Sequence, residues 1–155
     1  MRRVSLAGCA CLLAMALPSF AGEIILTGTD AISLHGDASY GAQLFADLSG
    51  GSSKPVLVLD SGFGLGAAYT GAPGGFVSVT SLSGVTLSNY SGLFVASPHE
   101  CCGDPSAEFA GFESAIASYV AGGGNLGVEN FLGGSFCGSG PDNYTTVLGL
   151  TPFQG

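Results

Sequence analysis

Few residues of this chain could do chemistry, and most of them follow short apolar runs that have the composition of buried strands. They are two histidines, five acids and one amide: Asp30, His35, Asp37, Asp60, His99, Glu100, Glu129 and Asn130. In an open parallel sheet, ligands bind at the carboxyl ends of the strands. We therefore predict that these residues share one rim, and that all of them except Asp37 bind a ligand there.

The rim could serve a metal, catalysis or neither. Clustered carboxylates favour a divalent cation such as calcium, whereas added imidazoles favour zinc. The candidate metal ligands are Asp30, Asp37 and Glu100. General acid–base catalysis would pair His99 with Glu129, with His35 as a further candidate. Polar residues also gather in loops for structural reasons, because they cap helices and bond to the backbone.

The sequence has no serine or cysteine nucleophile at the strand-to-turn position where an α/β hydrolase would need one. The chain has no Gly-x-Ser-x-Gly motif, which holds a serine on a strand-to-helix turn. At the matching turn, 127–131, Glu129 occupies the nucleophile's position. Gly62, Gly64 and Ala67 have dinucleotide-fingerprint spacing, but no acid for a ribose follows before Glu100. No cofactor other than a divalent cation is expected.

The elements that must position the rim are short apolar strands and amphipathic helices. We expect strands over 23–28, 55–60, 76–80, 92–97, 126–128 and 146–150. Asp37 or Ser39 can cap a helix whose apolar face carries Tyr40, Leu44, Phe45 and Leu48. A helix that leads directly into an apolar strand is half of a parallel crossover. We therefore predict an α/β three-layer sandwich with a mainly parallel sheet.

The clearest helix-to-strand unit spans 105–134. Asp104 suits the N-cap and Pro105 the first helical position. Apolar residues then recur at helical spacing, at Phe109, Phe112, Ile116, Tyr119 and Val120. The glycines at 122–124 end the helix before the strand at 126–128.

The first 21 residues have the pattern of a signal peptide, and 22–155 form one domain. A basic start at Arg2-Arg3 precedes an apolar run and a small-x-small site that ends at Ala21. Cys9 follows a lipoprotein-like string, but its apolar region comes after the cysteine rather than before it. We expect export to the periplasm, the cell surface or the extracellular space, with no membrane span in the mature chain.

The mature chain is strongly acidic. Its only Lys or Arg is Lys54, against eleven Asp and Glu, so its formal charge is 1 − 11 = −10. Nucleic acids and anionic membranes bind clustered Lys and Arg, so neither is an expected partner. We expect the partner to be a small molecule, a glycan or a surface protein. The acidity alone is also explained by solubility.

Three cysteines remain after residue 21, and export exposes them to oxidation. We expect a disulfide from Cys137 to either Cys101 or Cys102. A strained Cys101–Cys102 bridge, free thiols, and zinc held by the three cysteines with His99 are the alternatives.

Three stretches give the sequence a resemblance to a known family. They are the strand and loop at 24–30, the phrase Leu87-Ser88-Asn89-Tyr90 before 92–97, and the turn at 119–126, YVAGGGNL. Over about 23–150 the chain resembles class I glutamine amidotransferase-like (flavodoxin-like) domains, specifically the exported bacterial ones that often carry a PEP-CTERM sorting tag. The resemblance implies the same fold, but Glu129 replaces the nucleophile cysteine, so glutamine hydrolysis is not expected. No such tag follows Gly155, so we expect a chain that is either untagged or a fragment, and the lack of a clear last strand favours a fragment.

Two functions follow as hypotheses. The first is a non-amidotransferase binding or interaction module of unknown ligand, acting at a cell surface or in an extracellular matrix, and not an enzyme. The second is a secreted, metal-assisted hydrolase that uses His35, His99, Glu100 and Glu129. The two differ in geometry, because catalysis needs His99 and Glu129 within hydrogen-bond reach or one water apart.

Overall fold

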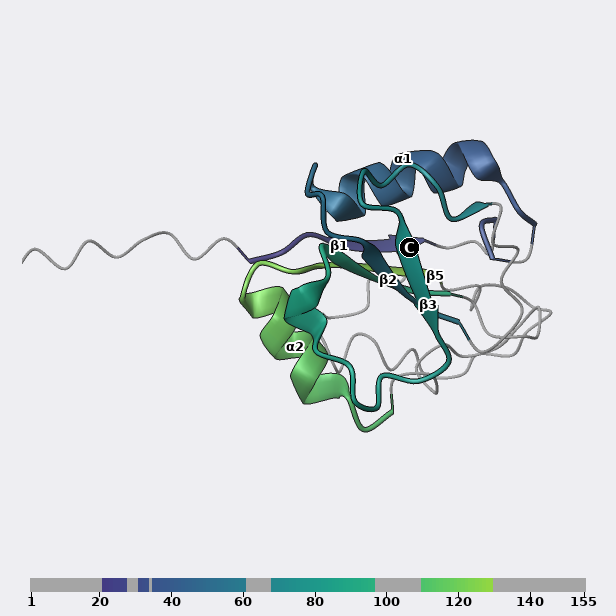
Figure 1. Cartoon of the computed structure of the whole chain (residues 1–155). Coiled ribbons are helices and arrows are strands. Elements are labelled where there is room, and N and C mark those ends of the chain that lie inside the picture. The colour runs from purple at the N-terminus through teal and green to yellow at the C-terminus, as the bar shows by residue number, and fades with distance from the viewer. Residues whose placement is uncertain (1–20, 28–30, 34, 61–67, 97–109, 130–155) are drawn as a thin grey trace, which may run out of the picture.

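The computed structural model of the chain describes residues 21–27, 31–33, 35–60, 68–96 and 110–129. The elements are β1 (Ile24–Thr27), α1 (Ala38–Ser49), β2 (Val56–Leu59), β3 (Phe76–Val79), the short 3-10 helix η2 (Leu87–Asn89), β4 (Gly92–Val95), α2 (Glu113–Ala121) and β5 (Asn125–Glu129). The five strands form one sheet in the order β1-β5-β4-β2-β3, and every pair is parallel. Helices α1 and α2 cover its two faces (Figure 1), so the predicted three-layer α/β sandwich is confirmed.

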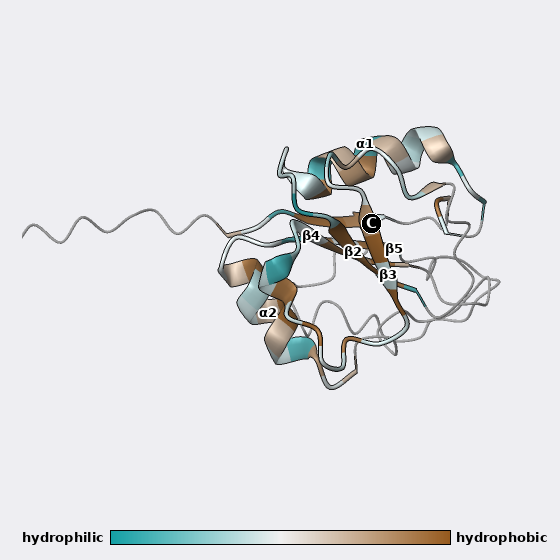
Figure 2. Cartoon of the chain, viewed as in Figure 1, coloured by the Kyte–Doolittle hydropathy of each residue, from teal (hydrophilic) through white to brown (hydrophobic). Residues whose placement is uncertain are grey.

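Two hydrophobic cores hold the layers together, one on each face of the sheet. Strand side chains alternate between the faces: Val56 and Val58 of β2 enter the core under α1, whereas Leu57 and Leu59 enter the core over α2. Figure 2 shows the strands as the most hydrophobic part of the described chain. Because β2 is fully buried on both faces, its sequence is continuously apolar, as expected for a central parallel strand.

The connections explain which face each segment covers. Connections between parallel strands are right-handed. A connection that leads toward β3 therefore lies on one face of the sheet, and a connection that leads back toward β1 lies on the other. It runs from β1 through α1 to β2 and on to β3 along the α1 face, where Ala68 and Tyr69 are buried. It then returns from β3 through η2 to β4, and through α2 to β5, along the other face. The connections that leave β2 and β4 therefore diverge, which makes the carboxyl ends of these strands the topological switch point.

Helix α1 begins at the predicted cap and packs closely on the chain below it. The Asp37 carboxylate accepts hydrogen bonds from the backbone N–H groups of Ser39 and Tyr40, at 3.1 and 3.0 Å, so the expected Asp37 cap is confirmed. Gly41 lies against the segment after β2, because a Cβ there would lie 2.0 Å from the Ala68 carbonyl oxygen. This close approach requires glycine at position 41.

Helix α2 is shorter than the sequence predicted. It begins at Glu113, with Phe112 as its N-cap. The prediction that the helix starts at Pro105 is therefore wrong, because residues 110–112 are not helical. Residues 104–109 lie outside the described residues. The reason for the late start is Gly111, whose φ of +86° is incompatible with a helix interior. Ile116 and Val120 are buried as expected. The helix ends at Ala121, directly before the glycines at 122–124 that were predicted to stop it.

Several predictions fall on other residues that the structure does not describe. These are the signal peptide, the strand at 146–150, and the disulfide between Cys137 and Cys101 or Cys102. Within the described ranges, neither helix has the length and apolar character needed to cross a bilayer.

Candidate functional site

A row of side chains crosses the carboxyl edge of the sheet on the α1 face. Leu59 pairs with Val95, and Val95 with Val128, so the residues that follow them, Asp60, Ala96 and Glu129, lie level. Thr27 pairs with Glu129 and extends the row to the edge strand β1. Since neighbouring strands are about 4.8 Å apart, the backbones of the two acids are separated by about 10 Å. Two acidic residues thus flank the small side chain of Ala96.

Glu129 is the most deeply buried acid of the row, with none of its surface exposed. Its Oε1 atom accepts a hydrogen bond from Ile32 N at 2.7 Å, and its Oε2 atom accepts one from Ser33 N at 3.1 Å. Ser33 N also lies 3.4 Å from Oε1. Hydrogen bonds to a carboxylate are stronger than those between neutral groups. Glu129 therefore fixes the loop between β1 and α1 over the end of β5.

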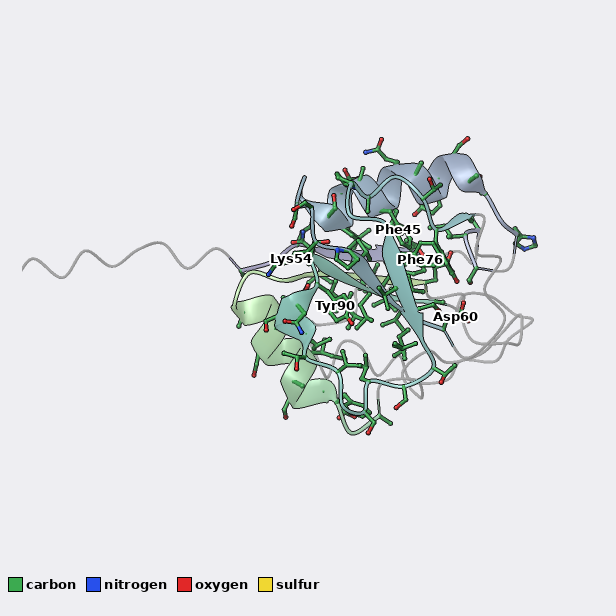
Figure 3. All side chains as sticks on the ribbon, in the orientation of Figure 1. Phe45, Lys54, Asp60, Phe76 and Tyr90 are labelled. Carbon is green, nitrogen blue, oxygen red and sulfur yellow. The ribbon has the colours of Figure 1, made fainter. Side chains whose placement is uncertain are left out.

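Asp60 at the end of β2 is also buried, at 5% exposure, and accepts a hydrogen bond from the Tyr69 hydroxyl at 2.9 Å. The Tyr69 ring is held by aromatic neighbours: it stacks on Phe45 with ring centroids 5.6 Å apart and meets Phe76 and Phe94 edge-on at 5.4 and 5.9 Å. Figure 3 labels Asp60, Phe45 and Phe76 in this part of the molecule. The Asp60 carboxylate is therefore positioned by a rigid aromatic group.

The tyrosines around the row are held in their protonated form. Burial raises the pKa of Tyr69 far above its usual value, and the hydrogen bond to Asp60 and the charges of Asp60 and Glu129 raise it further. Burial also raises the pKa of Tyr40, the Glu129 charge adds to this, and a hydrogen bond with Thr27 opposes it. A phenol beside an anion keeps its proton because ionisation would place two negative charges together. Both hydroxyls thus keep their protons at neutral pH, and Tyr69 donates its proton to Asp60.

The predicted site residues divide into three groups. Asp60 and Glu129 share one face of the carboxyl edge, as the rim hypothesis requires. His35 is exposed in the loop before α1, and Asp37, also exposed, uses its carboxylate to cap that helix. The remaining candidates, Asp30, His99, Glu100 and Asn130, lie outside the described residues. The pairing of His99 with Glu129 and the liganding roles of the other candidates therefore stay predictions.

Among the residues that the structure does describe, no three His, Cys, Asp or Glu side chains gather as a metal site would require. Asp37 is the one metal candidate in this part of the chain, and its hydrogen bonds go to α1. Two of the other proposed ligands, Asp30 and Glu100, lie outside it. A divalent-cation site at the rim stays a prediction.

Tyr69, Tyr40 and Ser33 also surround the row, although no sequence pattern predicts them there. Tyr69 lies in the glycine-rich stretch 61–75, where a large aromatic residue is the available signal of a buried ring. Ser33 is 1% exposed, and its Oγ atom has no hydrogen-bond partner in the part of the chain described here. Its backbone N–H, rather than its hydroxyl, contacts Glu129, and no sequence pattern reveals such a contact.

The row can bind or position a ligand more readily than it can transfer a proton. A general base must reach its substrate, yet the carboxylate of Glu129 is enclosed and bonded to the backbone. Asp60 lies at the switch point, where open α/β sheets bind ligands. Comparison with known proteins adds no family to this picture: no family model, curated protein or solved structure matches the chain.

Proposed function

We propose that the chain is an exported α/β domain without amidotransferase activity that acts as a binding or interaction module at a cell surface or in an extracellular matrix. The observation that carries this proposal is the state of Glu129. If the chain is an amidotransferase-like domain, Glu129 stands where such domains have their nucleophile; it is fully buried and accepts hydrogen bonds from Ile32 N and Ser33 N. A side chain with this role stabilises the fold rather than attacking a substrate.

The sequence supports the proposed location and partner. The apolar segment before Ala21 has the pattern of a signal peptide, and the strong negative charge after it disfavours nucleic acid. Asp60 is the described residue best placed for a ligand, because it ends β2 at the switch point and is fixed by Tyr69. A carboxylate there would accept hydrogen bonds from a hydroxyl-bearing ligand such as a glycan.

The enzymatic part of the proposal is tested with Glu129→Gln. Purified mature protein is assayed for glutamine, amide and ester hydrolysis, with and without calcium or zinc, and its melting temperature is measured in parallel. We expect no turnover from the wild type and a lower melting temperature for the variant. Turnover that Glu129→Gln abolishes at an unchanged melting temperature would instead establish the secreted hydrolase.

The binding part is tested with Asp60→Asn on a glycan array and on washed bacterial envelopes. Asparagine keeps an oxygen for the Tyr69 hydroxyl but removes the charge, so the fold should persist. Binding should fall about tenfold, which corresponds to one hydrogen bond to a charged group. Asp47→Asn is the matched control, since Asp47 is exposed on α1 and bonds to Gln43. Equal binding by both variants and the wild type would exclude the Asp60 site.

A further inference from the structure

A pocket lies at the opposite edge of the sheet from Asp60 and Glu129, where β2, β4 and β5 begin. It has a volume of about 380 Å³ and is lined by Lys54, Ser88, Tyr90, Ser91, Ser118, Tyr119 and the glycines at 122–124. This volume is within the range of about 300–1,000 Å³ that is usual for small-molecule sites. Figure 3 shows Lys54 and Tyr90 near α2, at the end of the sheet away from Asp60.

The pocket contains the only Lys or Arg that follows Ala21, and no acid of the described residues neutralises this cation. The Lys54 ammonium donates one hydrogen bond, to the Ser88 carbonyl oxygen at 2.8 Å. No carboxylate pairs with it among the residues described, in a chain with eleven acids. An ammonium has three N–H donors, so two remain to bind an anion.

The hydroxyl groups of the pocket can accept hydrogen bonds from a ligand, because their own protons are already donated to the backbone. Ser91 Oγ donates its proton to the Lys54 carbonyl oxygen at 2.9 Å, and Ser118 Oγ donates to Ser114 O at 2.8 Å. Tyr119 donates its proton to Tyr90 O at 3.3 Å. A hydroxyl has one proton and two lone pairs, so these three oxygens are left as acceptors. A ligand must therefore supply hydrogen-bond donors to them.

The Tyr119 ring forms an apolar wall beside these groups. Its position depends on Gly124, where a Cβ would lie 2.2 Å from the ring carbon Cζ. Burial raises the pKa of Tyr119 to about 12, so the phenol stays protonated and keeps its bond to the backbone. The pocket thus combines a free cationic donor, several fixed acceptors and an aromatic surface.

We propose that this pocket binds a small carboxylate-bearing sugar, such as a uronic acid monosaccharide, which brings a single negative charge to the single lysine. The carboxylate of the sugar meets Lys54, its hydroxyls donate to Ser91, Ser118 and Tyr119, and its ring packs beside Tyr119. A simple anion lacks the donors, and a neutral sugar lacks the charge. This site goes beyond the one proposed at Asp60, because it lies at the other edge of the sheet and uses none of the same residues.

The test is a titration of the ¹⁵N-labelled mature protein by NMR, with D-glucuronate, D-glucose, acetate and sulfate as the probes. Glucuronate should shift the amides of the glycines at 122–124 saturably, and bind about tenfold more tightly than glucose, acetate or sulfate. Lys54→Gln should remove this preference. Ser118→Ala should weaken glucuronate binding severalfold, whereas Ser83→Ala, an exposed serine outside the pocket, should not.

Three results would overturn the proposal: no binding of glucuronate, equal binding of glucuronate and any of the other probes, or unchanged binding by Lys54→Gln. Lys54 is exposed, so its substitution should not unfold the protein, and the amide spectrum reports the fold directly. Asp60→Asn should leave the glucuronate-dependent shifts of the glycines at 122–124 unchanged, because Asp60 does not line this pocket. The two proposed sites can therefore fail separately.

Discussion

The carboxyl and amino edges of this sheet hold their charged groups in different ways. At the carboxyl edge, Glu129 and Asp60 are buried and accept hydrogen bonds from the backbone of the β1–α1 loop and from Tyr69. At the amino edge, Lys54 is exposed, and within the described ranges its ammonium gives a single hydrogen bond, to the Ser88 carbonyl oxygen. The acids stabilise neighbouring segments, whereas most of the lysine's bonding capacity is left for a ligand.

This contrast predicts where a substitution should change stability and where it should change binding. Removing a partner from a buried charged group leaves unsatisfied polar atoms, which is costly. Removing an exposed charge that has no ion pair changes stability little. Substitutions at the carboxyl edge that remove a hydrogen-bonding partner, such as Glu129→Ala, should therefore lower stability, whereas Lys54→Gln at the amino edge should change binding and leave stability nearly unchanged.

The largest effect is expected from Glu129→Ala. It leaves the N–H groups of Ile32 and Ser33 buried without an acceptor, and each such group costs about 1–3 kcal/mol, so the free energy of unfolding should fall by about 3 kcal/mol or more. Urea denaturation monitored by circular dichroism measures this change.

The matched pair Glu129→Gln and Asp37→Asn separates burial from charge. Glutamine keeps one acceptor but turns an amide N–H toward a backbone donor, so a loss of about 1–3 kcal/mol is expected. Asp37→Asn makes the same chemical change at an exposed cap, where asparagine caps about as well as aspartate. Equal losses from the two variants would show that Glu129 has no special role in the fold.

A loss of similar size is expected from Tyr69→Phe, which removes the donor to Asp60 but keeps the ring. A hydrogen bond to a charged group contributes about 1.5–3 kcal/mol, and thermal unfolding should detect its absence. Tyr90→Phe is the control at the amino edge, because the half-buried Tyr90 contributes its carbonyl oxygen to Tyr119 rather than a bonded hydroxyl. If both variants are equally stable, the Tyr69–Asp60 hydrogen bond does not contribute.

The strands, helix α1 and the parallel arrangement could be predicted from the sequence because they follow from local rules. Apolar runs of four to six residues gave β2 and β4, helical spacing gave the buried face of α1, and Asp37 marked its start. The glycine turn at 122–124 correctly indicated a helix that leads into a strand. Each of these signals depends only on residues that are close together in the sequence.

The rest depends on contacts between distant residues, which local patterns do not specify. Glu129 was expected at the rim as a functional group, but its carboxylate is enclosed by Ile32 and Ser33, almost a hundred residues earlier. The burial of Tyr69 depends likewise on rings from α1, β3 and β4. The start of α2 was misjudged because the helical spacing continued past Gly111, whose positive φ interrupts it.

Alkaline pH should lower stability through tyrosines at both edges. The folded pKa of Tyr119 is about 12, against 10.0 in a model compound, and that of Tyr69 is raised as well. The folded protein therefore retains these protons after the unfolded chain has lost them, so stability is full below about pH 10 and declines as the pH rises toward 12. Urea midpoints between pH 8 and 11 should show the decline in the wild type and a smaller one in Tyr119→Phe. Identical profiles would mean that Tyr119 does not titrate differently on folding.

The smallest effect on stability is expected from Lys54→Gln. The side chain is exposed and has no ion pair in the described part of the chain, and exposed charges of this kind contribute about 0–1 kcal/mol. The hydrogen bond to Ser88 O can be kept by the glutamine amide, so the urea midpoint should change by less than it does in Tyr69→Phe. A loss as large as that of Glu129→Gln would mean that Lys54 stabilises the fold as the buried acids do, and the contrast between the two edges would then be lost. An unchanged midpoint would instead show that the fold does not need this cation. If the preference for glucuronate is lost at the same time, the charge of Lys54 serves binding rather than stability.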